Sequence, residues 1–438
     1  MTQMIRYSLI GLLALALIAF GLPVRAQESA PSLPLAAIQN GDLWLFGLGA
    51  GPQQVTSAGV LQNNASLTWG PQGNTLAFTM PNPDGTLSLM LTDRAGSEPV
   101  QLTSGVAFGF PISFTAEGEI LYAVSTQQYV EGAVNGGAGE VIELYTVAPQ
   151  VGAAPELIGS LTFGVGCGGG SSIPADWMYW TETGTNPGGS SLVLALTPHG
   201  LVHSINCTGV GTALLDLASG ESTPLGTDLG AVKVSPDGSQ VVGVNNAVPW
   251  QGTGQTVQVD VATGTVTTLS TSGTPDQLAW SADGGSVFYS TRRESGETVA
   301  MTPEQQQQVT EALGLMEPVT LPLWTASIHR LDLASGQDTE LYSTGAYAIG
   351  RMLPTPDGSA LIFSQIPNLE AWAQTLASGQ IADIWSQEGQ AQLLGTVAVD
   401  LLRLDLNSGA VDPVGTGMQQ AALNAAAYGE LAPLGAEG

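Results

Sequence analysis

The chain has 438 residues and a strongly acidic balance, with 37 Asp and Glu against 9 Lys and Arg and a formal net charge of −28. Nucleic acids and anionic membranes are both bound through Lys and Arg, so this balance excludes both as partners. Only 11% of the residues are charged and Gly is abundant, which is typical of many short strands joined by tight turns.

The first residues have the pattern of a secretory signal peptide. Arg6 supplies the positive charge, Leu9 to Leu22 is an apolar run, and Ala26 provides the small residue at a cleavage site. The alternative is an uncleaved membrane anchor, but the run is short for a bilayer span of about 20 residues. We therefore predict a cleaved leader at 1–26, a disordered segment at 27–35 and an extracytoplasmic protein, either secreted, at the cell surface or periplasmic.

A tight-turn signature recurs along the rest of the chain, each time between two apolar segments. Proline presets the first turn position, Asp accepts backbone N–H groups and Gly adopts positive φ. The six copies end at Gly73, Gly118, Gly200, Gly238, Gly284 and Gly358.

A second signature, a strand followed by a glycine-containing turn and an outer strand, comes after each of these copies. It is clearest at Leu215–Gly220, Val259–Gly264, Leu331–Gly336 and Leu404–Gly409. Two of the intervals between first-signature glycines are near the 40–45 residues of a four-stranded propeller blade. The two turns together predict four antiparallel strands, A to D, per repeat.

The combination of Ser-Pro-Asp-Gly at 235–238 with Asp-Leu-Ala-Ser-Gly at 216–220 resembles the TolB-like, WD-type propeller repeats of exported bacterial proteins. The resemblance covers about residues 36 to 420, and it implies an all-β propeller of four-stranded blades. Because that fold serves many functions, it does not by itself identify an activity.

The expected propeller domain spans 36–434 and leaves a tail at 435–438. Residues 42–46 and 53–55 are expected to form a C and a D strand, and 418–434 an inner strand, so that both termini build one closing blade. This predicts seven blade positions, six full repeats plus the composite blade, with six as the alternative.

The long segments between strands all fall in B–C or D–A connections, which emerge on one end of a propeller. They are 127–139, 161–190, 246–255, 292–325 and 366–398. We call this end the decorated face, and the end with the short A–B and C–D turns the plain face. Short helices are expected in the insertions: one capped by Thr302 and ending at Gly314, one at 369–376, and one around 381–387.

Aromatic residues concentrate in or beside these insertions, and they form the candidate binding face. Tryptophan is favoured at binding hot spots, although long insertions also use it to fill small cores of their own. The candidates are Trp177, Tyr179, Trp180, Trp250, Trp324, Trp372 and Trp385.

The two cysteines, Cys167 and Cys207, fall where one repeat returns to the decorated face. Export makes a disulfide chemically sensible, and a redox pair would favour close spacing such as Cys-x-x-Cys. We therefore predict a structural disulfide between them.

The sequence lacks a Gly-x-Ser-x-Gly elbow, and none of its three histidines lies in the insertions, so no catalytic residues, metal site or cofactor are assigned. Calcium would be attracted by the carboxylates, but composition names no ligands for it. The sequence favours a monomeric, non-catalytic binding or scaffold protein that presents the decorated face to a protein or glycan. The alternative is a carbohydrate-active enzyme that uses carboxylates on the same face.

Overall fold

The computed structural model describes residues 35–39, 41–46, 52–61, 66–70, 73–83, 86–107, 110–134, 137–164, 193–204, 212–226, 229–245, 254–355, 357–381, 393, 398–419 and 427–428. All of them belong to one compact unit, Pro34–Gly438, and the leader predicted at 1–26 lies outside the described residues. The expected domain boundaries therefore stay predictions.

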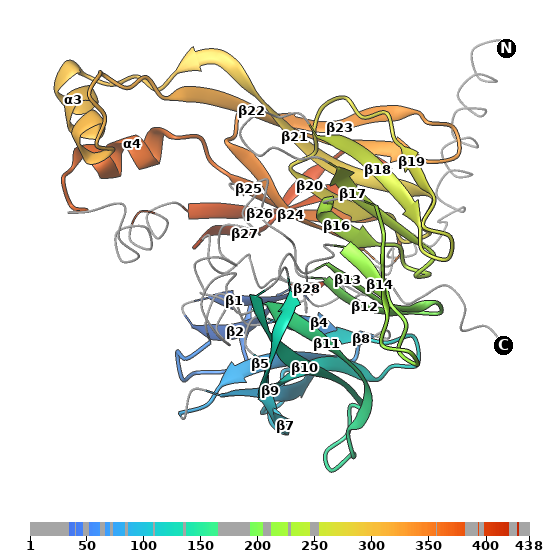
Figure 1. Ribbon diagram of the computed structural model, residues 1–438. Coiled ribbons are helices and arrows are strands. Elements are labelled where there is room, and N and C mark those ends of the chain that lie inside the picture. The colour runs from blue at the N-terminus through green and yellow to red at the C-terminus, as the bar shows by residue number, and fades with distance from the viewer. Residues whose placement is uncertain are drawn as a thin grey trace, which may run out of the picture. The chain divides into compact units, whose positions relative to one another are not determined.

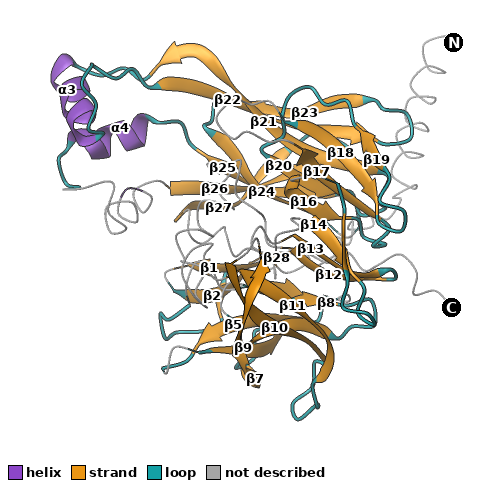
Figure 2. Cartoon of the chain, viewed as in Figure 1, coloured by secondary structure: helices purple, strands orange, loops and turns teal. Residues whose placement is uncertain are grey.

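The described strands confirm an all-β architecture of antiparallel sheets with two helices (Figures 1 and 2). Four sheets follow the predicted A-B-C-D order along the chain. They are β12 to β15 (Val193–Thr197, Gly200–Ser204, Thr212–Leu215, Ser222–Pro224), β16 to β19 (Leu229–Val234, Gln240–Asn245, Gln255–Asp260, Val266–Thr268), β20 to β23 (Gln277–Trp280, Ser286–Thr298, Pro322–Asp332, Asp338–Thr344) and β24 to β27 (Ala348–Pro354, Ala360–Ile366, Ala398–Asp405, Val411–Gln419).

A fifth four-stranded sheet combines segments from the two ends of the described chain. Its order is β28 (Ala427–Tyr428), β1 (Leu35–Gln39), β2 (Asp42–Phe46) and β3 (Gln53–Gln54). The expected C and D strands and the inner strand from the C-terminal segment are confirmed. The B strand is β1, which the sequence pattern did not reveal. Pairing β1 with both β2 and β28 leaves neither of its edges open.

Among the described strands, the remaining eight form one sheet beside the five four-stranded sheets. The expectation of six or seven separate blades is therefore wrong. The reason is a direct pairing of Val106 in β7 with Val124 in β9, which joins two successive repeats. Its strands are β4 (Leu67–Trp69), β5 (Thr75–Pro81), β6 (Leu87–Asp93), β7 (Val100–Val106), β8 (Ser113–Phe114), β9 (Ile120–Val134), β10 (Gly137–Val147) and β11 (Glu156–Gly164).

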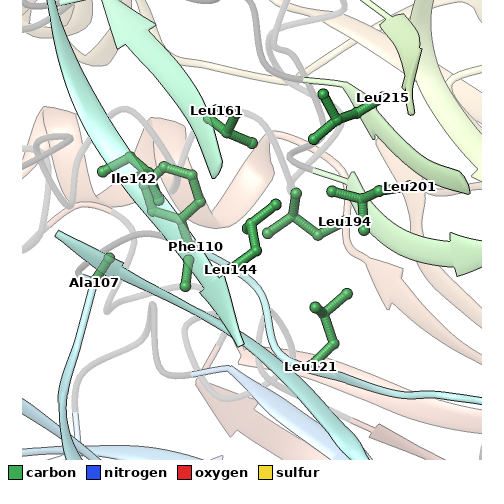
Figure 3. Close-up of a cluster of buried hydrophobic side chains, with 10 residues drawn as sticks. Ala107, Phe110, Leu121, Ile142, Leu144, Leu161, Leu194, Leu201 and Leu215 are labelled. Carbon is green, nitrogen blue, oxygen red and sulfur yellow. The ribbon is translucent and has the colours of Figure 1, made fainter. Parts of the chain in front are cut away.

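The sheets are arranged like the blades of a propeller, because their first strands contact one another in chain order. β12 contacts β16, β16 contacts β20, β20 contacts β24, and β24 contacts β28, which in turn contacts β4. The core lies between successive sheets. Figure 3 shows one such cluster, in which Leu121 and Leu144 of the eight-stranded sheet, with Phe110 from the connection between β7 and β8, meet Leu194 and Leu201 of the next sheet.

The tight turns form as their residue types predict. Gly200, Gly238 and Gly284 have φ of 130°, 71° and 68°. In the turn at 281–284, the Asp283 carboxylate accepts hydrogen bonds from the Ser281 hydroxyl (2.6 Å) and from the Gly285 amide (3.0 Å). These side-chain bonds close the hairpins without long loops.

Two insertions extend strands, and one of these two also contains a helix. The 127–139 insertion lengthens the β9–β10 hairpin, and the 292–325 insertion lengthens β21 and β22 and contains α3 (Pro303–Ala312). Thr302 caps α3, and the Gln305 side chain completes the capping box, as predicted. Helix α4 (Glu370–Ala377) is the second predicted helix. The third falls largely outside the described residues.

Candidate functional site

The side chains of one mixed aromatic and charged cluster come from several connections of the decorated face. Asp276 precedes β20, and Arg292 lies in the extended part of β21. Trp324 lies in the facing part of β22, two residues from Ala326, the cross-strand partner of Arg292. Tyr347 lies between β23 and β24, and Trp372 lies in α4. We call these five residues the Arg292 cluster. Its residues come from two successive sheets, and they lie in or beside both the B–C and the D–A connections of this face.

Arg292 lies over two aromatic rings. Its guanidinium carbon is 4.8 Å from the centroid of the Tyr347 ring and 5.4 Å from that of Trp324. Its Nε is 3.4 Å from Oδ2 of Asp276, and the two side chains are only 15% and 12% exposed. A cation over an aromatic face gains more when it is partly desolvated, about 2 kcal/mol at the upper end. The arginine is therefore fixed by the rings as well as by the carboxylate.

The three rings pack against one another at different inclinations. Trp324 meets Tyr347 edge to face at 6.0 Å and 82°, and Tyr347 meets Trp372 at 6.0 Å and 37°. All three are half-buried. The indole Nε1 atoms of Trp324 and Trp372 are buried and make no hydrogen bond within the described structure. Buried donors without acceptors cost free energy, so the cluster holds more hydrogen-bond donors than it satisfies.

Asn368 fixes the position of Trp324. Its amide oxygen accepts a hydrogen bond from the Trp324 backbone N–H (2.8 Å), and its amide nitrogen donates to the Trp324 carbonyl (3.0 Å). β23 pairs with β22 only from Ala326 onward. The asparagine amide therefore replaces the next strand at this edge and holds the 366–372 segment against β22.

Burial raises the pKa of Asp276 to about 6, and the nearby Arg292 opposes this effect without cancelling it. The ordinary value for Asp is about 3.9. The charged form of this carboxyl is thus disfavoured even with a guanidinium 3.4 Å away. Such a carboxyl titrates at mildly acidic pH, whereas exposed aspartates do not.

Two of the predicted binding residues, Trp324 and Trp372, are brought together in this cluster. The other five candidates, together with Cys167 and Cys207, lie outside the described residues. Sequence reasoning missed Asp276, Arg292 and Tyr347. The available signal was the rarity of basic residues: Arg292 is one of 9 Lys and Arg in the whole chain.

The cluster is separate from the small core of the helical insertions. That core is aliphatic, with Val309 of α3 and Leu376 of α4 buried together with Ile381. Figure 1 shows α3 and α4 at the end of the extended β21–β22 hairpin. The two tryptophans do not fill this core, which was the structural alternative for them. Their own packing partners are Tyr347 and Arg292.

A second polar cluster ties two successive sheets together. Asp338 of β23 accepts hydrogen bonds from the Tyr289 hydroxyl and from the Ser272 amide (2.9 Å), and its Oδ1 is 3.5 Å from Nδ1 of His329. The Tyr289 ring stacks on His329 at 4.9 Å. Because Ser272 belongs to the connection that follows β19, this network joins that connection to the next sheet. Burial of the phenol raises the pKa of Tyr289, and the acceptor role of Asp338 adds to the shift.

Among the described residues, no three His, Cys, Asp or Glu side chains gather as metal ligands would. Burial lowers the pKa of His203 to about 4, so this histidine is neutral at physiological pH. The helices in the described ranges include none that is long and apolar enough to cross a membrane.

No model of a known protein family matches the chain, and no curated protein matches it either. Solved structures similar to it include TolB from Acinetobacter baumannii (15% identity, TM-score 0.40), with 71% of this chain and 63% of that chain covered. The chain thus spans less than two thirds of that protein. A TolB candidate from Agrobacterium tumefaciens has 14% identity and a TM-score of 0.37, over 88% and 90%. Oligogalacturonate lyase from Vibrio parahaemolyticus has 12% identity and a TM-score of 0.44, over 88% of each chain.

Proposed function

We propose that this protein is an exported, non-catalytic binding or scaffold protein that presents its decorated face to a protein or glycan partner. The single observation that supports this most is the Arg292 cluster. Aromatic residues and arginine are the residue types enriched at binding hot spots. Here they converge, half-buried, from three connections at one end of the sheets, and two indole donors have no acceptor among the residues that the structure describes.

The rest of the chain supports the same proposal by its charge. A formal charge of −28 keeps such a protein soluble and disfavours nucleic acids and anionic membranes as partners. The arginine of the cluster is thus a local exception in an acidic chain. Export rests on the leader pattern at 1–26. It is checked by sequencing the N-terminus of the protein taken from its native cells, where a start at Gln27 is expected.

The test is binding to a glycan array and to proteins of the native cell envelope, by wild type and by Trp324→Ala and Trp372→Ala. Truncating a hot-spot side chain costs about 2 kcal/mol or more, so each variant should bind about 30-fold more weakly. The matched control is Val151→Ala, because Val151 is 62% exposed in the plain-face turn between β10 and β11. Equal binding by all four proteins would contradict the proposal, as would turnover of a glycan without a stable complex.

One observation favours a second candidate, an acid-catalysed carbohydrate-active enzyme on the same face. A carboxyl whose pKa is raised to about 6 is suited to act as a general acid near neutral pH, and Asp276 is such a group. Glycoside hydrolysis also requires a second carboxyl about 5–10 Å away. The ion-pair partner of Asp276 at this site is a guanidinium, that of Arg292, which lies over the rings of Tyr347 and Trp324. The turnover assay above decides between the two.

A further inference from the structure

We propose that Arg292 anchors a single carboxylate of a peptide partner, and that Asp276 occupies the guanidinium while the partner is absent. This inference rests on the proposed function, because it names the chemical group that the Arg292 cluster recognises. Three features carry it: the environment of the guanidinium, the weakness of its ion pair with Asp276, and the supply of hydrogen-bond donors around it.

The two aromatic rings beneath the guanidinium fix its position. Tyr347 and Trp324 hold it at 4.8 Å and 5.4 Å from their centroids, and only 15% of the side chain is exposed. A partly desolvated, pre-positioned guanidinium binds carboxylates more strongly than one that is free in water, because less order and less hydration are lost on binding. Arginine also matches the geometry of a carboxylate with two parallel N–H groups.

The ion pair between Asp276 and Arg292 is weak. Its Oδ2 lies 3.4 Å from the arginine Nε, longer than the roughly 2.7–2.9 Å of a strong charge-assisted hydrogen bond. Burial also raises its pKa to about 6, so its charged form is disfavoured where it stands. A partner carboxylate that enters from solvent brings its charge with it and lets Asp276 become neutral. Asp276 takes up a proton from solvent, so the exchange keeps one negative charge beside the guanidinium and is favoured at mildly acidic pH.

The donors around the site complete the match to an anion. The indole Nε1 groups of Trp324 and Trp372 are buried donors without an acceptor in the described structure. The other charged side chains nearby on these elements, Arg293 and Glu294 of β21 and Glu370 of α4, are exposed. A ligand group that accepts hydrogen bonds would pair the two indole donors, and a negative charge on that group would be attracted by the guanidinium.

A peptide fits the site better than a sugar. Sugars stack on open aromatic faces, but here the guanidinium covers Trp324 and Tyr347, and Trp372 packs against Tyr347 at 37°. A ligand must therefore be recognised through hydrogen bonds to these donors and not by stacking on an aromatic ring. A single carboxylate is favoured over a polyanion, because a chain with a formal charge of −28 repels a densely charged ligand.

The test uses three pools of N-acetylated random hexapeptides made from uncharged residues. The first ends in a free carboxylate, the second in a carboxamide, and the third in a carboxamide with one internal Glu. We expect the wild-type protein to retain the first or third pool at least tenfold better than the second at pH 5.5. The first and third pools distinguish a chain-terminal from a side-chain carboxylate.

Substitutions test whether the preference for carboxylate-containing peptides depends on Arg292. Arg292→Gln should abolish it, and Arg293→Gln, which removes the same charge from the adjacent exposed residue, should leave it intact. If the Gln variant does not fold, Arg292→Lys keeps the charge and should lose most of the preference, because it lacks the planar fork. Asp276→Asn removes the competitor, so it should bind the acidic pool several-fold more tightly at pH 7.5 and show little change between pH 5.5 and 7.5.

Equal retention of acidic and amidated pools, or a preference that survives Arg292→Gln, would overturn the inference. If peptides bind without a charge preference but are lost in Trp324→Ala, the proposed function stands and this inference fails. If no pool is retained at all, this inference fails too, and the glycan array decides the proposed function by itself.

Discussion

The plain face and the decorated face both contain aspartates, and the two ends of the sheets hold them in different ways. In the plain-face turns, each carboxylate accepts several short hydrogen bonds from neighbours in sequence. Asp332 accepts from the Ser335 amide (2.8 Å) and hydroxyl (2.7 Å), and Asp405 does the same with Ser408. These bonds favour the charged form and lower the pKa of both groups.

On the decorated face, Asp276 has the opposite shift, because burial raises its pKa to about 6 and its one arginine partner only opposes this. The comparison shows what the excess of acidic residues does in this protein. The turn aspartates are structural acceptors that close hairpins, whereas Asp276 is held in an environment that its charge does not stabilise. An ionisable group of that kind marks a functional site more often than a turn does.

The largest expected effect breaks a plain-face turn. Gly200 has φ of 130°, and a Cβ there would lie 2.5 Å from the Leu215 carbonyl oxygen. Gly200→Ala should therefore lower the free energy of unfolding by about 3 kcal/mol or more, through backbone strain and the clash together. Gly220→Ala is the control, because Gly220 has φ of 75° with open space around it. It should cost only about 1 kcal/mol. Urea unfolding measures both, and equal losses would contradict the clash.

The sequence predicts this end of the molecule well, because each turn is decided by its own four or five residues. Ser281, Asp283 and Gly284 carry their hydrogen bonds and backbone angles within one short segment. The helix cap at Thr302 is local in the same way. Local patterns of this kind can be identified without any knowledge of the rest of the fold.

The Arg292 cluster could be predicted only in part. Trp324 and Trp372 were found as aromatic residues in insertions, but Asp276 is 16 residues from Arg292 and Tyr347 is 55 residues from it. Their contacts depend on how neighbouring sheets pack, and composition says nothing about that. The pairing of Val106 with Val124 was missed for the same reason. It joins two repeats whose turn signatures are each complete.

The second prediction tests the opposite signs of the two aspartate groups. The folded pKa of Asp276, about 6, lies above the unfolded value of about 3.9. Its stabilising contribution is therefore complete below about pH 3.9 and is lost as the pH rises through 6. Two pKa units correspond to about 3 kcal/mol. Asp276→Asn resembles the protonated form, so it should be more stable than wild type by about 2–3 kcal/mol at pH 7.5 and close to wild type near pH 3.

Asp332→Asn is the matched comparison on the plain face. The pKa of Asp332 is lowered in the folded state, so its contribution is present above the unfolded value and is lost as the pH falls through the folded one. This variant should be less stable than wild type at pH 7.5, and the difference should shrink in acid. Urea unfolding at both pH values measures the two variants together. An Asp276→Asn protein that is less stable at pH 7.5 would show that its ion pair with Arg292 stabilises the fold.

The smallest expected effect comes from removing the Ser281 hydroxyl, which donates a hydrogen bond to the Asp283 carboxylate in the turn. Ser281 donates to Asp283 (2.6 Å) and accepts from the buried Ser286 amide (2.9 Å). Ser281→Ala removes both bonds and should cost about 1–2 kcal/mol at pH 7.5. It should also move the pKa of Asp283 back toward its ordinary value, because the Ser281 hydrogen bond is the main cause of its lowering.

The chain provides its own control for this change. Thr355 occupies the same turn position in a later repeat, and its hydroxyl donates to Asp357 at 2.5 Å. Ser281→Thr should therefore keep both the stability and the lowered pKa of Asp283. Urea unfolding and NMR titration of the Asp283 carboxyl measure the two effects. If Ser281→Ala leaves that pKa unchanged, the backbone amides alone set the charge of the turn, and the difference between the two faces of the protein comes from burial rather than from hydroxyl donors.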